Sequence, residues 1–285
     1  VAAFTAGHIA ALTSTQADGL TAGQIGAMTS AQFAAMTTTT LASLDATQIA
    51  AIEVLDFGTL SGAKIAAITT DQISSLTTAQ IVALTAAQIP SLTTGQIANL
   101  TNAQIAAIEV NDLALFDATQ IGALTATQAP ALTTAQVQGL TTAQFQALET
   151  ADLAAFTVGQ IAAIQNEDIA VLSTAQIDAL TAAQVQALTV TQIVTMTGTQ
   201  LAAIETADFA TMGTAQIAAI QAVDIPSLTT TQITALTNAQ FGAFTTDQIA
   251  ALTVVQIDQL TATQLGALDM TQSAAFTVDQ RLSME

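Results

Sequence analysis

The chain has 285 residues, of which 21 are acidic and only 2 are Lys or Arg, so its formal net charge is −19. A charge of this sign repels nucleic acids and anionic lipid surfaces, which excludes both as partners. The absence of cysteine excludes disulfides and thiolate metal sites, and Thr and Gln interrupt every apolar run before it could span a bilayer.

An eight-residue repeat keeps one phase along the chain. Every eighth residue from Phe4 to Met284 is Leu, Ile, Met or Phe. A second large apolar residue follows five positions later in nearly every octad. The exceptions to this second position include Ala17, Ala129, Ser273 and Arg281. No insertion or deletion breaks the phase, so we predict a single continuous repeat array over residues 1–285, about 35 octads with no internal boundary.

The spacing of the apolar residues indicates short helices. It alternates between five and three, as in Leu76, Ile81 and Leu84, whereas a half-buried strand repeats every two residues. One continuous helix is also excluded, because eight residues overshoot two turns by about 80° and the apolar stripe would wind around the helix. We therefore expect an all-α solenoid with one very short helix per octad.

The polar residues of each octad predict where its helix begins. In the octad that contains Thr85 and Gln88, Thr is followed three residues later by Gln, and the same holds for Thr93 and Gln96. This is a capping box, in which the Thr hydroxyl accepts from the Gln N–H and the Gln side chain bonds to the Thr N–H. The apolar residues that flank each pair occupy the two positions of a hydrophobic staple.

Three prolines fall directly after the Ile position of their octads, at Pro90, Pro130 and Pro226. A proline there would remove a hydrogen bond from a regular α-helix. We therefore expect helices of barely more than one turn, some of them 3₁₀ in character.

A longer period overlies the octad. Asp replaces the Gln at six positions, and four of these lie 56 residues apart. The six are Asp56, Asp112, Asp152, Asp168, Asp208 and Asp224. Seven octads thus form a 56-residue unit, which occurs five times and records either a fixed superhelical phase or duplication of an ancestral unit. Glu53 and Glu205 stand three residues before Asp56 and Asp208, and we interpret these pairs as caps in which the long and short side chains are exchanged.

No catalytic or cofactor site emerges from the sequence. His8, the only histidine, occupies a Gln position and is interpreted as an alternative cap, and no Ser/His/Asp or Cys/His group can be built around it. We therefore expect no enzymatic activity. The acidic stretches could attract Ca²⁺ weakly, although no EF-hand pattern is present. The candidate ligands are Glu109, Asp112, Glu167 and Asp168.

The phrase "LTTAQIVALTAAQIPSLTTGQIANL" at residues 76–100 resembles the repeat regions of very large secreted or surface proteins of bacteria, both adhesin-like and matrix-forming. The resemblance implies a bacterial protein, extracellular or on the cell surface, with a structural or adhesive role. The calcium-binding nonapeptides of toxin-type repeat adhesins are absent from the chain, so their calcium dependence is not implied.

These observations lead us to expect a structural protein whose partner is itself. The repeat begins in phase at the first residues and continues almost to the last, so we expect apolar cross-sections at both ends that favour assembly into a fibre, matrix or surface layer. The alternative is an adhesin stalk or binding rod, which includes an ice-binding surface lined by the regularly spaced Thr. Neither hypothesis involves nucleic acid or membrane insertion.

Overall fold

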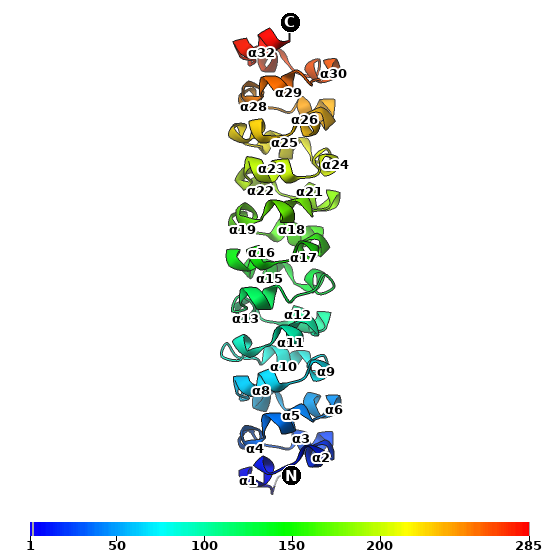
Figure 1. The fold of residues 1–285 in the computed structure, drawn as a ribbon, viewed down its shortest axis with the longest axis vertical. Coiled ribbons are helices and arrows are strands. Elements are labelled where there is room, and N and C mark those ends of the chain that lie inside the picture. Colours follow the sequence, from blue (N-terminus) through cyan, green and yellow to red (C-terminus); the bar gives the residue numbers. More distant parts are fainter. Residues whose placement is uncertain (2, 285) are drawn as a thin grey trace. The chain divides into compact units, whose positions relative to one another are not determined.

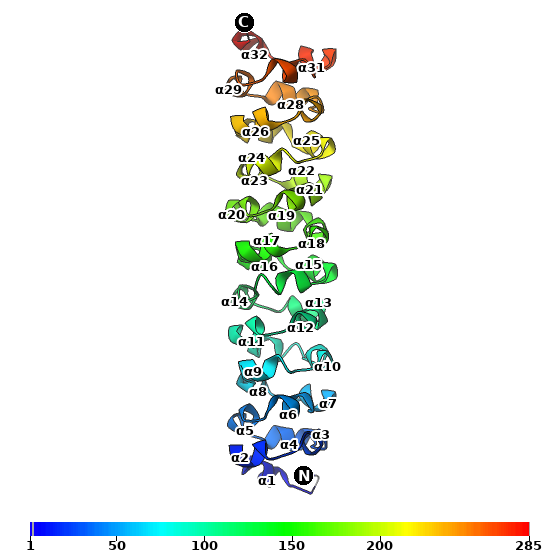
Figure 2. The same cartoon turned by 90° about the vertical axis from the view of Figure 1, so that its right-hand side faces the viewer.

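The computed structural model describes residues 1 and 3–284, and in these it consists of short helices without a strand (Figures 1 and 2). Each octad supplies one helix of three to six residues. This confirms the predicted all-α solenoid of very short helices.

The chain divides into two compact units, Val1–Leu148 and Glu149–Glu285. The octad phase runs through this boundary unchanged, so the continuous sequence pattern does not anticipate the division. The boundary falls directly before Glu149, the residue three positions ahead of Asp152.

The helices of the first unit are α1 (Ala6–Ala10), α2 (Ser14–Asp18), α3 (Ala22–Gly26), α4 (Ser30–Ala35), α5 (Thr38–Ala42), α6 (Ala46–Ala50), α7 (Val54–Phe57), α8 (Gly62–Ala67), α9 (Thr70–Ile73), α10 (Thr78–Val82), η1 (Ile89–Ser91), α11 (Thr94–Ala98), α12 (Asn102–Ala107), α13 (Val110–Leu113), α14 (Ala118–Ile121), η2 (Ala129–Ala131), α15 (Thr134–Gly139) and α16 (Thr142–Ala147).

The helices of the second unit are α17 (Thr150–Ala155), α18 (Val158–Ala163), α19 (Asn166–Val171), α20 (Thr174–Asp178), α21 (Ala182–Ala187), α22 (Val190–Thr195), α23 (Gly198–Ala203), α24 (Thr206–Phe209), α25 (Thr214–Ala219), η3 (Ala222–Ser227), α26 (Thr230–Ala235), α27 (Asn238–Phe241), α28 (Thr246–Ala251), α29 (Val254–Ile257), α30 (Ala262–Leu265), α31 (Met270–Ala274) and α32 (Val278–Ser283).

A sharp corner separates successive helices. At the end of α12, Ile108 leaves the helical region with φ −62° and ψ 129°. At the start of the same helix, Thr101 is also extended, with φ −71° and ψ 159°, and its hydroxyl caps α12 by accepting from the Gln104 N–H. The Leu-type residue therefore ends one helix and the Thr starts the next, which confines each helix to little more than a turn.

The core of each unit consists of the two apolar positions of the octad. The residue after Gln is buried along the stack, as at Ile97, and so is the Leu-type residue, as at Leu92 and Leu140. Exposed members of the Leu-type column occur only in the first and last octads, at Phe4 and Met284. Both columns are buried because each octad places the same two residue positions toward the core.

One superhelical turn contains between three and four octads. Helices three octads apart pack on each other, as α1 does on α4 and α5 on α8 (Figure 1). The side chain of Gln80 instead reaches four octads back, to the carbonyls of Ile49 and Ile52, which lie 31 and 28 residues earlier. A step of 28 residues is half of the 56-residue period, so seven octads complete two turns.

The three prolines lie in the three 3₁₀ helices, as the sequence predicts. Pro90 is in η1, Pro130 in η2 and Pro226 in η3. In η1 the Ser91 N–H donates to the Gln88 carbonyl at 2.9 Å, a bond three residues back. The tighter helix needs no N–H from the proline position, so the octad keeps its place in the stack.

Candidate functional site

Beyond the first turn, a Gln in the third capping position joins two turns of the solenoid. Its Oε1 accepts from the N–H of its own cap residue, as Gln80 does from Thr77 at 2.8 Å. Its Nε2 donates to the preceding turn, at 3.0 Å to the Ile49 carbonyl and 2.9 Å to the Ile52 carbonyl. The same pattern recurs through both units. A buried amide is thus fully bonded on both sides, which stabilises the contact between turns.

The sequence analysis predicted the bond between Gln and its own cap residue but not the bonds from Gln to the preceding turn. A capping box accepts Glu or Gln at its third position, yet none of the octads has Glu there. This preference for Gln over Glu is the sequence signal for the bonds between turns, because only the amide has N–H groups to donate to carbonyls of another turn.

The predicted caps differ between the two octads. At Thr93 and Gln96 both bonds of the capping box are present, at 2.8 Å and 3.2 Å. At Thr85 the backbone N–H donates to Gln88 Oε1 at 2.8 Å, but the Thr85 hydroxyl donates to the same oxygen at 3.1 Å. The Gln88 N–H bonds instead to the Thr85 carbonyl at 2.8 Å, so the prediction that this hydroxyl accepts an N–H is wrong in this 3₁₀ octad.

The exchanged caps are also a correction. Glu53 and Glu205 start their helices with extended backbone, but neither side chain makes a capping hydrogen bond. Asp56 Oδ1 accepts from the Ser30 hydroxyl of a neighbouring turn rather than bonding to Glu53. The reciprocal cap predicted for these Glu/Asp pairs is therefore absent at Glu53 and Glu205. His8 does act as the predicted alternative cap, since its Nδ1 accepts from the Thr5 N–H at 3.2 Å.

The calcium candidates form two acidic pairs. Burial raises the pKa of Asp112, and the negative charge of Glu109 raises it further. Burial and the charge of Glu167 raise the pKa of Asp168 in the same way. Over residues 1 and 3–284, no group of three or more His, Cys, Asp or Glu side chains is placed to hold a metal ion. The structure thus brings the members of each pair together but adds no third ionisable ligand.

Two Asp side chains in the Gln position are almost fully buried. Asp152 and Asp168 are each 2% exposed. Burial is the main reason that the pKa of each carboxyl rises to about 6, with a smaller effect from the charges of Glu149 and Glu167, respectively. Asp152 Oδ2 is buried without a hydrogen-bond partner among the described residues. Such groups change charge near neutral pH.

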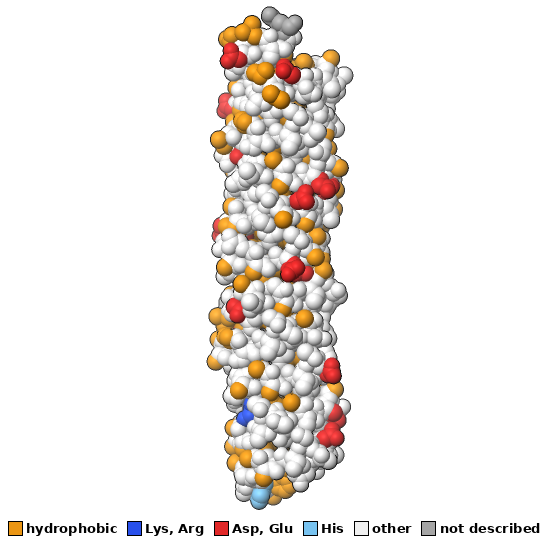
Figure 3. All heavy atoms as spheres, in the orientation of Figure 1, with side chains coloured by type: hydrophobic (Ala, Val, Ile, Leu, Met, Phe, Trp, Pro, Cys, Tyr) orange, Lys and Arg blue, Asp and Glu red, His pale blue; other side chains and the backbone are white. Residues whose placement is uncertain are grey.

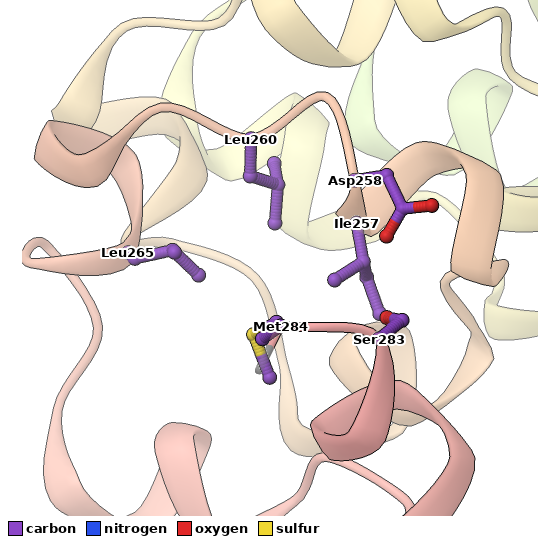
Figure 4. A pocket seen from close by; sticks show the side chains of 6 residues that line it. All are labelled: Ile257, Asp258, Leu260, Leu265, Ser283 and Met284. Atoms are coloured by element: carbon purple, nitrogen blue, oxygen red, sulfur yellow. The ribbon is translucent and has the colours of Figure 1, made fainter.

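A cavity of about 320 Å³ lies at the end of the second unit (Figure 4). Four of the six lining residues have apolar side chains, and the other two carry a carboxyl and a hydroxyl group. The lining residues are Ile257, Asp258, Leu260, Leu265, Ser283 and Met284. Asp258 and Ser283 supply the polar side chains of this lining.

The surface is sparsely charged. On the face shown in Figure 3, acidic side chains form separate spots among neutral and apolar atoms. In the first unit, Val54, Val82 and Val110 are 41%, 46% and 36% exposed and lie 28 residues, or one turn, apart. We call these three residues the valine line.

Comparison with known proteins identifies the repeat. A family model described as the ALTTAQ repeat matches residues 49–86, 65–102, 105–142, 161–198, 201–238 and 217–254. No curated protein matches the chain. Among the described residues, no helix is long and apolar enough to cross a lipid bilayer.

Proposed function

The chain belongs to the ALTTAQ repeat family, and from this premise we propose that it is a structural protein that assembles with copies of itself into an extracellular fibre, matrix or surface layer. The observation that carries the proposal is the valine line. Its three side chains lie on the outside of the first unit and recur once per turn. Isolated surface valines are ordinary, but a row in step with the turn offers the same small apolar contact at each turn.

A second copy of the chain is the occupant that fits this line. Two identical solenoids have the same distance between turns, so their valines coincide along the whole contact when the units lie side by side. Charged residues are only 8% of the chain, but Glu53 and Glu109 directly precede Val54 and Val110, so we expect contact between two copies to need salt that screens these acids. A repeated, self-complementary surface of this kind suits packing of identical subunits.

The composition supports an extracellular location. With two basic residues in 285, proteases that cleave after Lys or Arg find almost no site, and the lack of cysteine removes the most oxidisable side chain. The charge of −19 opposes association at low ionic strength, and salt would screen it. Calcium enters this proposal only as a counter-ion that the pairs Glu109–Asp112 and Glu167–Asp168 attract weakly.

Sedimentation and negative-stain imaging across a salt series test the proposal. We expect larger, ordered assemblies as salt rises, and loss of assembly when Val54, Val82 and Val110 are all replaced by Thr. The matched control replaces Val158, Val190 and Val254 by Thr, because these valines are similarly exposed but are not spaced by one turn. Single molecules at every salt and calcium concentration would refute self-assembly and favour an adhesin stalk or a ligand-binding rod.

A further inference from the structure

Contacts between turns reach only the neighbouring turn. Within each unit, the hydrogen bonds that join described residues of different turns span 25 to 31 positions, from the pair Thr206 and Thr231 to the pair Gln80 and Ile49. Helices that pack on each other lie three octads apart, as α10 and α12 do. A turn is therefore held by the turn before it and the turn after it, as is general for solenoids.

The Gln side chains supply hydrogen bonds across these contacts. Gln96 Nε2 donates to the Ile65 carbonyl at 2.7 Å and to the Ile68 carbonyl at 2.6 Å. These bonds join successive turns of the stack (Figure 2), so a pull along the stack would separate donor from acceptor. The chain has no cysteine, so no disulfide locks one turn to the next. A broken contact can therefore form again when the pull ends.

Octads with Asp in the Gln position make fewer bonds between turns. Among the described residues, the side chains of Asp112 and Asp208 make no hydrogen bond to another turn. Asp56 accepts one such bond, from the Ser30 hydroxyl, whereas Gln96 donates two. The hydrogen bonding between turns is thus weakest at Asp112 in the first unit and at Asp208 in the second.

A folded turn stores a large length of chain. Packed helices lie about 8–10 Å apart, so one turn contributes roughly 10 Å to the length of the stack. The turn contains 28 residues, and a chain of that size spans about 90–100 Å when it is extended. Opening one turn therefore adds roughly 80–90 Å. The turns on either side can stay folded, because each still packs on its other neighbour.

We propose that the solenoid is an extensible element, in which a pull opens turns one after another and release of the pull lets them close again. Separation begins at Asp112 and Asp208, where the Gln bonds between turns are missing. The adjoining octads then unravel, because their apolar columns lose the turn that covered them on one side. During closing, each capping box re-forms its helix from residues of one octad, and the helix packs again on the turn that stayed folded.

The role of this extension within a fibre rests on the function proposed above. The opening of turns, in contrast, is a property of a single molecule, so it can be measured without assembly.

Stretching of single molecules in optical tweezers tests the proposal. The chain of 285 residues is held through a cysteine added at each end, since it has no cysteine of its own. Force and length are recorded while each molecule is pulled and relaxed repeatedly. We expect a series of small steps, each of which adds roughly 80–90 Å or a small multiple of that length. The folded length should return during relaxation.

A matched pair of variants tests the bonds between turns. Gln96→Ala removes the bonds to the preceding turn and should move one step to lower force. Gln24→Ala is the control, because the Gln24 side chain accepts from the Thr21 N–H at 2.8 Å but makes no bond to another turn among the described residues. Both variants lose a cap bond, since Gln96 accepts from the Thr93 N–H at 2.8 Å. Only Gln96→Ala should therefore change the force of a step.

A second variant tests where separation begins. Replacing Asp112 and Asp208 together by Gln installs the residue that most octads carry and should leave fewer openings at the lowest forces. An unchanged number of these openings would refute separation at the two Asp octads.

Rupture of a whole unit in a single step would overturn the proposal, and so would equal forces in Gln96→Ala and Gln24→Ala. Failure of the unchanged protein to regain its folded length at low force would refute the closing of the turns. Molecules that lengthen step by step, but stay single at every salt concentration in sedimentation, would support the extensible solenoid and refute the proposed fibre.

Discussion

The side chain of Gln80 spans one full turn of the solenoid. Its Nε2 donates to the Ile52 carbonyl at 2.9 Å, 28 residues earlier in the chain, while its Oε1 accepts from the Thr77 N–H at 2.8 Å. A single amide therefore fixes the start of its own helix and the distance to the preceding turn. The same contact repeats along each unit. Its separation of 28 residues is half of the 56-residue period.

Replacing Gln80 by Ala should destabilise the first unit strongly. The Ile49 and Ile52 carbonyls and the Thr77 N–H would lose their partner, and each buried group left unpaired costs about 1–3 kcal/mol. Gln16→Ala is the control, since Gln16 is exposed and its side chain only accepts from the Thr13 N–H, without a bond to another turn among the described residues. Urea unfolding of both variants gives the comparison, and equal losses of stability would contradict a special role for the bond between turns.

The two caps predicted from sequence should respond differently to truncation. Thr93→Ala removes the acceptor of the Gln96 N–H and should cost about 1 kcal/mol, the usual contribution of a helix N-cap. Thr85→Ala should cost less, because the Thr85 hydroxyl accepts no backbone N–H and only donates to Gln88. Thermal unfolding of the two variants measures the difference. Thr93→Ser retains the hydroxyl and should remain close to the unchanged protein.

The Leu-type column should be most sensitive where its side chains are fully buried. Leu140 is fully buried, so Leu140→Ala should cost about 2–5 kcal/mol through lost burial and the cavity left behind. Leu20 occupies the same position near the start of the chain but is half-buried, and Leu20→Ala should cost less. Chemical denaturation measures the free energy of unfolding of both variants. A larger decrease for Leu20→Ala would contradict a core formed by the buried Leu-type column.

Two helical glycines should give opposite results when replaced by Ala. At Gly198 an added Cβ would lie 2.7 Å from Ser227 Cβ and 3.1 Å from Asp224 Oδ1, in the next turn. Gly198→Ala should therefore destabilise the second unit by about 1–3 kcal/mol. Gly23 has no atom within 4 Å of that position, so Gly23→Ala should stabilise its helix by roughly 0.5–1 kcal/mol. Melting temperatures of the two variants provide the test.

Asp117 should show the opposite pH dependence to the buried Asp residues. Hydrogen bonds from the Thr119 hydroxyl and from the Gln120 N–H lower the pKa of this exposed cap below its ordinary value. A lowered pKa in the folded state adds stability above the ordinary Asp pKa, and that stability is lost as the pH falls through the folded value. Relative to Asp117→Thr, the unchanged protein should lose stability between about pH 5 and about pH 2.

Melting curves of the two proteins over that range provide the measurement. At Asp152 and Asp168 the sign is reversed, since a pKa of about 6 means that stability is complete below the ordinary value and lost as the pH rises through 6. A parallel pH dependence for Asp117 and these buried groups would contradict the difference in their surroundings.

Local patterns in the sequence were sufficient to predict the repeating element. The apolar residues at alternating spacings of five and three, such as Leu76, Ile81 and Leu84, define the two buried columns, and Thr with Gln three residues later defines where each helix starts. Even the 3₁₀ octads follow from a local cause, because Pro90 has no N–H to donate within a helix. All of these depend on residues within one octad.

The tertiary structure decided what depends on residues about one turn apart. The hydrogen bond from Gln80 to Ile52 and the close approach of Gly198 to Ser227 join residues 28 or 29 positions apart, and this separation sets the size of the turn. The octad pattern is nearly uniform along the chain, so it does not indicate which residues at that separation come together. The burial of Asp112 is also a property of the folded chain. The sequence marks Asp112 as unusual by its 56-residue spacing, but burial is the main cause of its raised pKa, and burial arises only from packing in the folded chain, which removes the carboxyl from water.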